Sequence, residues 1–409
     1  MPDKVRFQAI KGVRDILPPE SALWNRVEQT AREVFGTYGF AEIRLPILEQ
    51  RELFDRSIGG ETDIVSKEMY GIANPLLIIK NMLVGETKFP GFKRDPSEYL
   101  RFLMSLSVFL TVAKDALQSK ELGAENERGI HELDVAFQAG LKHFPNPDPS
   151  KESERQQLRK EVGELIGRIE VEEQSLRPEA TASVVRAYIE HGMQVLPGNV
   201  KLYYMGPMFR RERPQKGRYR QFYQIGAEVL GTSDAPGIDA EVIEMLMSFF
   251  ERLKLKGAVL NINSIGDKNC RPAYVEKLRA ELQKVREQLG ADSQRRIETN
   301  PLRVLDSKLE HEQPIIEKLP RIGENLCADC RAHYAEVKQQ LDLRGIQYQE
   351  NWRLVRGLDY YMRTTFEITA PGLGSQNAVC GGGRYDGLVE LLGGPAGPRA
   401  SASPLAPTG

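Results

Sequence analysis

The sequence predicts an α+β fold, in which helices flank an antiparallel sheet that also carries helical insertions. Residues 204 to 228 alternate apolar and polar side chains on both sides of an arginine-rich loop, which is the pattern of two antiparallel strands. Residues 20 to 38 and 234 to 254 instead place apolar side chains at helical spacing. The chain is therefore expected to combine a sheet with long helices.

The first helix and strand are marked by proline and glycine. An extended, turn-rich start over residues 7 to 20 precedes the helix of residues 20 to 38, which ends at its glycines. A strand is expected over residues 40 to 45, where Pro46 stops it. Further strands are expected over residues 258–266, 355–368 (a strand pair around a glycine) and 378–388.

Two long segments are expected to be helical. Residues 71 to 175 contain a strongly apolar helix over residues 100 to 117, a proline-broken turn and then a charged helix. Opposite charges spaced three or four apart indicate a solvated face on the charged helix. Residues 267 to 345 are also expected to be mostly helical, with prolines between the helices.

Composition limits the classes of function. The chain has 409 residues, enough for more than one domain. Its formal net charge is -1, from 56 basic and 57 acidic residues, so a nucleic acid would have to meet a local basic patch. We find no secretory leader and no run of about 18 apolar residues. The expectation is a soluble cytoplasmic protein that does not contact a membrane.

Five arginines crowd the loop between the two predicted strands. Arginine side chains cannot fill an apolar sheet face, and a cluster of forked, permanently charged donors suits a polyphosphate or the end of a nucleic acid. The five are Arg210, Arg211, Arg213, Arg218 and Arg220.

Three other polar segments each allow two interpretations. Glu179, displayed by Pro178, could hold an ammonium group or could start a helix. The segment VRGLDYY either contributes Arg356 and its tyrosines to a ligand or is an ordinary strand. The triple glycine before Arg384 lacks the context of a phosphate-binding loop and more simply leaves room for a ligand.

The four cysteines do not form a disulfide framework. Cys327 and Cys330 form one CxxC motif, and His333 follows three residues later. One CxxC and one histidine make at most half a zinc site. We therefore expect two reduced thiols at a helix start and no metal.

The order and spacing of six segments resemble the catalytic domain of the histidyl-tRNA synthetases, a family of class II aminoacyl-tRNA synthetases. The resemblance covers about residues 7 to 70 and 176 to 394, and VRGLDYY and CGGGRYDG are its most specific parts. The six segments are IKGVRD, GFAEIRLPILE, LRPEATA, FRRERPQKGRYRQFYQIGAE, LVRGLDYY and CGGGRYDG.

This resemblance implies a class II synthetase-like fold and a histidine–tRNA ligase activity. The histidine carboxylate would attack the α-phosphate of ATP, bound with Mg²⁺, and give histidyl-adenylate and pyrophosphate. A terminal ribose hydroxyl of tRNA(His) would then take the histidyl group. The protein would act by positioning and charge stabilisation, with no resident metal.

The resemblance also assigns roles to single residues. Arg210 and Arg356 would flank the α-phosphate, Glu212 would read the adenine amino group and Arg218 would hold the outer phosphates. Because Glu228 lies four residues after Gln224 on one strand, both side chains project from the same face. The residues that would bind histidine are Glu179, Thr181, Gln224, Glu228, Tyr360, Tyr361 and Tyr385.

The family pattern further implies a domain order and a homodimer. Pro46 and its strand match motif 1, which in the family builds the dimer interface. The expected segments are 1–70 (catalytic domain with motif 1), 71–175 (atypical helical insertion), 176–266 (catalytic domain with motif 2), 267–345 (the family's helical insertion, which can reach the tRNA acceptor stem), 346–394 (histidine-specific motifs) and 395–409 (disordered tail).

Two features depart from the family pattern. The 105 residues from 71 to 175 stand where the family has a short hairpin. The segment after Gly394 lacks a motif 3 pattern and an anticodon-binding domain, and losing one charged contact to a transition state costs about 3 kcal/mol, or roughly two decades in rate. We therefore expect impaired activity.

Two other classes of function compete with a ligase. The regulatory subunit of ATP phosphoribosyltransferase has the same fold and does not charge tRNA, whereas the arginine-rich loop and Arg356 favour ATP chemistry. A simple tRNA-binding fragment would show tight, salt-sensitive binding that does not depend on histidine.

Overall fold

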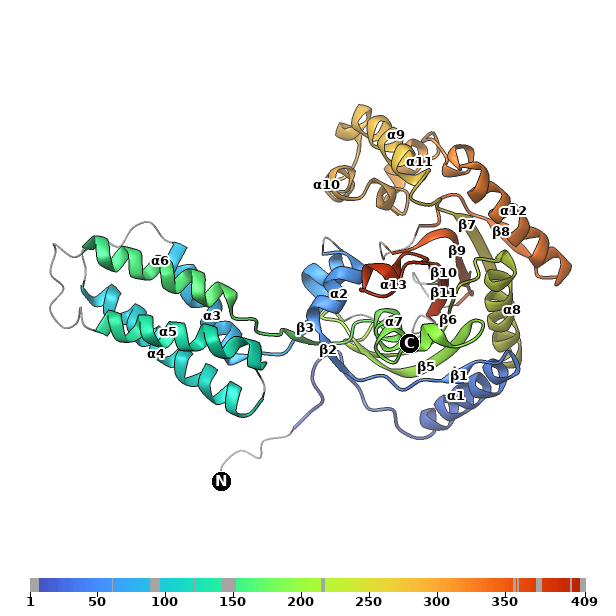
Figure 1. Ribbon diagram of the computed structural model, residues 1–409. Coiled ribbons are helices and arrows are strands. Elements are labelled where there is room, and N and C mark those ends of the chain that lie inside the picture. Colours follow the sequence, from blue (N-terminus) through green and yellow to red (C-terminus); the bar gives the residue numbers. More distant parts are fainter. Residues whose placement is uncertain are drawn as a thin grey trace, which may run out of the picture. The chain divides into compact units, whose positions relative to one another are not determined.

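The protein divides into two compact units. A computed structural model describes residues 7–60, 62–88, 96–120, 122–141, 152–214, 218–355, 358, 360–372, 377–397 and 399–404, giving only the backbone for 85–88, 96–100, 152, 155 and 399–404. One unit comprises Met1–Tyr70 with Leu176–Gly409, and the other comprises Gly71–Ser175 (Figure 1). These boundaries coincide with those predicted for the segment from 71 to 175.

The first unit is built on a mainly antiparallel sheet. Among the described residues eight strands form it, in the order β1-β5-β6-β11-β10-β9-β7-β8, with parallel pairing only at β1–β5 and β7–β8 (Figure 1). The strands are β1 Ala41–Glu42, β5 Val200–Phe209, β6 Gln221–Gly231, β7 Val259–Ser264, β8 Tyr348–Glu350, β9 Met362–Thr369, β10 Ala378–Arg384 and β11 Arg399–Pro404.

The longest pairing in this sheet is the predicted hairpin around the basic loop. Strands β5 and β6 pair from Val200–Leu230 at one end to Phe209–Gln221 at the other. Because successive side chains on a strand point to opposite faces, Leu202 and Tyr204 lie on one face and Tyr203 lies on the other. The prediction of two antiparallel strands here is confirmed.

Helices cover both faces of the sheet. On the face of Tyr203, apolar side chains of α1 (Glu20–Thr37), α8 (Pro236–Arg252) and α12 (Ala328–Leu343) form one core with the strands. On the opposite face, Tyr204 shares a core with α7 (Thr181–Glu190). The predicted helices at 20 to 38 and 234 to 254 are confirmed.

The segment from 267 to 345 is mostly helical, as predicted. Its elements are α9 Arg271–Lys284, η5 Arg286–Gln288, α10 Ala291–Thr299, η6 Pro301–Val304, η7 Glu310–Glu312, α11 Gln313–Ile316, η8 Ile322–Asn325 and α12. The remaining short elements are α2 Arg51–Ile58, the π-helix η1 Ile64–Glu68, η4 Met193–Val195 and α13 Leu388–Leu391, with β2 Leu48–Gln50, β3 Tyr70–Gly71 and β4 Gln174–Leu176 in a small sheet of order β2-β4-β3.

The second unit is a helical bundle with an apolar core of its own. It contains α3 Pro75–Lys88, α4 Pro96–Gln118, η2 Ala124–Asn126, α5 Glu127–Leu141 and α6 Glu152–Arg168 (Figure 1). The side chains of Leu83, Leu106, Phe109 and Leu133 are fully buried in this core. The predicted helix over 100 to 117 and the charged helix after it are confirmed. None of the described helices is long and apolar enough to cross a membrane.

Three expectations about strands need correction. The strand predicted over 40 to 45 is only β1, and of the strand pair predicted over 355 to 368 the described residues form only β9. The tail from 395 was expected to lack a strand, yet β11 pairs with both β6 and β10. Strands pair through hydrogen bonds between main-chain N–H and C=O groups, which every residue except proline has in full. A segment of alanine and serine can therefore enter a sheet although it has no apolar pattern.

Candidate active site

A cluster of buried acidic and phenolic side chains lies where α7, β5, β6 and β10 meet. Its centre is Glu228 on β6, which is fully buried. Thr181 donates a hydrogen bond from Oγ1 to Glu228 Oε1 at 2.8 Å, and the Tyr385 hydroxyl donates to Oε2. Burial raises the pKa of Glu228 well above its usual range. The two hydrogen bonds lower this pKa in part, and the nearby carboxylate of Glu179 raises it further. The side chain therefore favours its neutral form until a ligand brings positive charge or a hydrogen-bond donor.

Glu179 lies two residues before the first residue of α7 and also belongs to this cluster. Its two carboxylate oxygens accept hydrogen bonds from the main-chain N–H of Thr181 at 2.7 Å and of Ala182 at 3.0 Å. The helix-start interpretation of Glu179 is therefore correct. Burial raises the pKa of Glu179, while these N–H groups and Arg210 oppose the rise. Each oxygen has a second lone pair, so an ammonium group could still bind it.

Three tyrosines pack against the two carboxylates. The ring of Tyr360 lies 4.7 Å from the ring of Tyr361 and 5.6 Å from that of Tyr385, measured between centroids. All three are buried, and burial is the main reason why the pKa values of Tyr360 and Tyr385 lie well above their usual range. The hydroxyls of Tyr360 and Tyr385 stay protonated at neutral pH and can donate or accept hydrogen bonds.

Gln224 lies on the same strand as Glu228, as predicted, and is also buried. Its Oε1 finds no hydrogen-bond partner among the described residues. Buried polar atoms are nearly always paired in folded proteins, so an unpaired acceptor beside a cluster of polar side chains indicates a place for a ligand.

Arg210 lies beside this cluster. Its Nε donates a hydrogen bond to the carbonyl oxygen of Pro178 at 3.0 Å, and its guanidinium carbon lies 5.1 Å from the centroid of the Phe222 ring. Pro178 directly precedes Glu179, so one short segment connects the arginine with the buried carboxylates. The structure thus brings the predicted phosphate-binding arginine next to the predicted histidine-binding residues.

The other predicted nucleotide-binding residues lie in the loop after β5. Arg218 forms an ion pair with Glu212, with 3.0 Å between Nη1 and Oε2. The main chain of Arg220 donates to the carbonyl of Gly12 at 2.7 Å, which connects the loop with the IKGVRD segment. Arg356 lies outside the described residues, so the predicted approach of Arg210 and Arg356 to one phosphate stays a prediction.

Two arginines near the motifs are structural. Arg177 donates to the carbonyl oxygens of Leu45, Pro46 and Pro207 at 3.0 to 3.1 Å. A Cβ on Gly206 would come within 2.5 Å of Nη2 of Arg177, so glycine leaves room for this guanidinium group. These contacts leave Arg177 no direct role in the acidic cluster.

Arg384 is the second structural arginine. It is buried between two carboxylates, 2.9 Å from Asp239 and 3.1 Å from Asp386. His333 also faces Asp239, with Nε2 3.7 Å from the carboxylate, and burial lowers the pKa of this histidine.

Sequence reasoning missed Tyr204. Its side chain is buried, burial raises the pKa of its hydroxyl well above the usual range, and the nearby carboxylates of Glu228 and Glu179 raise it further. The signal was the strand register: Tyr204 pairs with Gly226, two residues before Glu228, and residues two apart share one face of a strand.

Comparisons with known proteins agree on one family. The sequence model of the family described as histidyl-tRNA synthetase matches residues 149–400. A histidine–tRNA ligase of Solibacter usitatus is 46% identical over 387 residues, which covers 95% of this chain and 70% of that protein. A histidine–tRNA ligase of Koribacter versatilis is 46% identical over 396 residues, covering 96% and 70%.

Solved structures show the same fold. The apo histidyl-tRNA synthetase of S. aureus aligns with a TM-score of 0.60 and 30% identity, covering 98% of this chain and 72% of that one. A protein of Bacillus halodurans described as an ATP phosphoribosyltransferase regulatory subunit/histidyl-tRNA synthetase aligns with a TM-score of 0.53 and 16% identity, over 98% and 81%. The second similarity concerns the fold alone.

Proposed function

Because the chain belongs to the histidyl-tRNA synthetase family, we propose that its buried glutamate–tyrosine cluster binds histidine and that the adjoining arginine loop binds ATP. The chain is an aminoacyl-tRNA ligase whose substrates are histidine, ATP and tRNA. The alternative of a regulatory subunit is not favoured, because the relatives at 46% identity are ligases.

One observation carries the assignment of the site. Glu228 is fully buried, receives hydrogen bonds from Thr181 and Tyr385, and lies in the cluster that adjoins Arg210. A buried carboxylate costs free energy of folding unless it is hydrogen-bonded or paired, so a fully buried one beside an arginine is typical of a binding site. Glu228 and Glu179 suit the cationic groups of a substrate, and the neighbouring Arg210 suits the phosphate to which that substrate is joined.

Histidine offers an ammonium group, a carboxylate and two ring nitrogens. We assign Glu228 to accept a hydrogen bond from one ring N–H and Tyr361 to the other nitrogen. Glu179 and Thr181 would hold the ammonium group, while Gln224 would contact the main-chain end of the substrate. Apolar analogues would be rejected because they offer no ring N–H, so the lone pair of Glu228 assigned to that donor would stay buried and unfilled.

Arg210 and Arg356 would stabilise the activation step from opposite sides of the α-phosphate. The histidine carboxylate attacks phosphorus, the bond to the bridging oxygen breaks, and pyrophosphate leaves. ATP would enter as its Mg²⁺ complex, which is the substrate. The ion pair between Glu212 and Arg218 would open on binding, because Glu212 is assigned to the adenine amino group and Arg218 to the outer phosphates.

We extend the proposal to partners and location. The chain would act in the cytoplasm on tRNA(His), and the helices of residues 267 to 345 would approach the acceptor stem.

The chain would also form a homodimer through the motif 1 strand. The exposed side chains of Ile47 and Leu48, which follow Pro46, support this surface. Light scattering should give a dimer mass for the chain and a monomer mass for Ile47→Glu.

The site assignment is tested by binding and exchange measurements. We expect histidine to bind in calorimetry, Glu228→Ala to abolish this binding, and Glu251→Ala, at an exposed position of α8, to leave it unchanged. Histidine-dependent exchange between ATP and pyrophosphate should fall about 100- to 1,000-fold in Arg210→Ala. The exposed Arg252→Ala is the matched control. Unchanged histidine affinity in Glu228→Ala would reject the pocket.

A further inference from the structure

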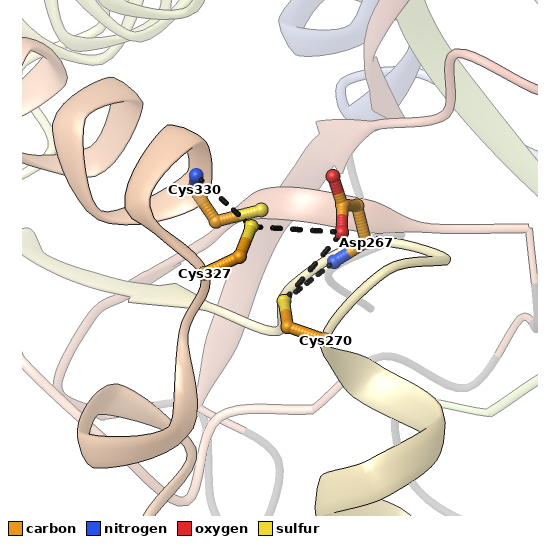
Figure 2. Close-up of side chains that lie close together, drawn as sticks. All are labelled: Asp267, Cys270, Cys327 and Cys330. Atoms are coloured by element: carbon orange, nitrogen blue, oxygen red, sulfur yellow. Dashed lines mark hydrogen bonds between the residues drawn. The ribbon is translucent and has the colours of Figure 1, made fainter.

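Three cysteines and one aspartate from distant parts of the chain meet at one point (Figure 2). Asp267 and Cys270 lie between β7 and α9, and Cys327 and Cys330 lie at the start of α12. One ligand atom from each residue lies within 4.8 Å of all the others. Figure 2 shows the three sulfurs and the carboxylate of Asp267 turned toward one another.

These distances suit a four-coordinate metal ion. Zinc–sulfur bonds are about 2.3 Å long, so two donor atoms of a tetrahedral site lie roughly 3.8 Å apart. Here Oδ1 of Asp267 lies 3.5 Å from the sulfur of Cys270 and 3.9 Å from that of Cys327. Only small shifts would bring all four donors to bonding distance of one ion.

Half of this site could be recognised in the sequence. The CxxC motif of Cys327 and Cys330 supplies two metal ligands, and His333 was the neighbouring candidate for a third. In the structure His333 faces Asp239, whereas Asp267 and Cys270, also three residues apart, lie against the CxxC. The missing pair stands about 60 residues earlier, so only the fold could identify it.

Main-chain N–H groups are aimed at two of the sulfurs. The N–H of Asp267 donates to Sγ of Cys270 at 3.4 Å, and the N–H of Cys330 donates to Sγ of Cys327 at 3.5 Å. Such donors stabilise a thiolate, which is the form that binds metal. Cys270 and Cys327 are also the N-cap residues of α9 and α12, so both helix dipoles favour negative charge here.

Neighbouring groups hold the carboxylate of Asp267 in position. Its Oδ2 accepts a hydrogen bond from Nδ2 of Asn269 at 3.4 Å and lies 3.9 Å from the guanidinium of Arg363. Oδ1 is the oxygen nearer to the sulfurs. Contacts of this kind orient a ligand in most metal sites, and Arg363 would offset part of the negative charge of a loaded site.

Gly266 leaves the space for the sulfur of Cys270. Its φ of +67° lies in the left-handed region, and an added Cβ would come within 2.8 Å of this sulfur. The turn between β7 and α9 therefore depends on glycine to bring Asp267 and Cys270 together.

Burial distinguishes this cluster from a chance group of exposed acids and thiols. Cys330 is fully buried, and Asp267 and Cys270 are 5% and 7% exposed. Burial also raises the pKa of the Cys330 thiol, so a bound cation would have to displace its proton.

We propose that Asp267, Cys270, Cys327 and Cys330 bind one zinc ion in a structural site. Three thiolates select a soft or borderline ion over Mg²⁺ or Ca²⁺. Four protein ligands complete a tetrahedron and leave no position for substrate, so the ion would be structural. It would fasten the start of α9 to the start of α12 and so close the base of the helical segment between them.

Metal content of the full chain is the direct test. After purification without chelators, elemental analysis should find close to one zinc per chain. Cys270→Ser and Cys327→Ser should each lose the stoichiometric metal, whereas Cys380→Ala, which removes a buried cysteine outside the cluster, should keep it. Less than 0.1 equivalent in the unchanged chain, even after zinc is added back, would overturn the proposal.

Cobalt gives a second test that does not depend on the variants folding. Co²⁺ added to the metal-free full chain should produce the visible bands of a tetrahedral thiolate complex and saturate at one equivalent. Stoichiometric zinc should abolish these bands. Their absence with reduced thiols, or a disulfide among these cysteines in freshly purified protein, would show that the cluster is not a zinc site.

Discussion

The Glu228 carboxyl determines how the candidate site responds to pH. In the folded protein burial raises its pKa well above the value expected in the unfolded chain. Folding therefore favours the protonated form, and stability is lost as pH rises through the folded-state pKa. In the proposed site the histidine ring N–H favours the ionised acceptor, so histidine and rising pH would both shift Glu228 toward its ionised form.

We predict that Glu228→Gln flattens this pH dependence. The amide cannot ionise, so the variant avoids the cost of a buried charge, and its free energy of unfolding relative to the unchanged chain should increase from pH 5 to pH 9. Urea unfolding at several pH values measures this difference. Glu251→Gln on the surface of α8 is the control, and a difference that is independent of pH would contradict the prediction.

A second prediction concerns the buried ion pairs of Arg384. Replacing this arginine with leucine removes the guanidinium from two buried carboxylates, Asp239 and Asp386, which should cost about 3 to 5 kcal/mol in the free energy of unfolding. Arg252→Leu breaks an exposed pair with Glu33 and should cost about 0.2 to 1 kcal/mol. Chemical denaturation compares the two, and equal costs would refute a structural role for Arg384.

At this scale the sequence predicted residues better than their contacts. Glu228, Gln224 and Tyr385 were implied by the resemblance to the family; all three are buried, and Tyr385 donates a hydrogen bond to Glu228. The hydrogen bonds of Glu179 to the start of α7, the ion pair of Arg218 with Glu212 and the carbonyl contacts of Arg177 depend on the fold and could not be predicted.

At the scale of elements, local patterns were sufficient for the β5–β6 hairpin and the long helices. Alternation and helical spacing are properties of neighbouring residues, so they can be read directly. Strand β11 was missed because its place between β6 and β10 depends on main-chain groups far away in sequence. The same reason hid Asp267 and Cys270 as partners of the CxxC.

The strand register gives a prediction for Gly226. A Cβ at this position would come within 2.3 Å of the Tyr204 ring, which is buried across the strand pair. Gly226→Ala should therefore cost about 1 to 3 kcal/mol of stability and weaken histidine binding by displacing Tyr204.

The matched control is Gly36→Ala. Gly36 lies in α1 with no atom near the added methyl group, and this change should be neutral or stabilising by up to about 1 kcal/mol. Thermal unfolding and calorimetry report the two effects. Unchanged histidine affinity in Gly226→Ala would separate Tyr204 from the site.

At the scale of the whole molecule, the division into two units is the main departure from the family pattern. The sequence marked residues 71 to 175 by composition, and the structure gives them a separate apolar core. The overall architecture was predictable because six motifs in a fixed order imply one sheet. The packing of the helices in the second unit could not be predicted, since no motif occurs in that segment.

We predict that the helical unit can be removed. Ile72 donates from its main chain to the carbonyl of Gln174 at 2.8 Å, so the two ends of the segment lie side by side. Replacing residues 73 to 173 with an Asn-Gly turn should leave a folded chain whose histidine affinity is within about threefold of the original. Calorimetry measures this, and loss of binding in a cooperatively folded variant would give the unit a role in the site.

The hydrogen bond from Arg210 to the carbonyl of Pro178 has a consequence for the order of substrate binding. The peptide that carries Glu179 also accepts a hydrogen bond from the arginine assigned to the α-phosphate, so the proposed histidine and nucleotide sites share this segment. Binding of either substrate should therefore order the segment and increase the affinity for the other. By thermodynamic reciprocity, the factor by which histidine tightens a non-hydrolysable ATP analogue must equal the factor by which the analogue tightens histidine.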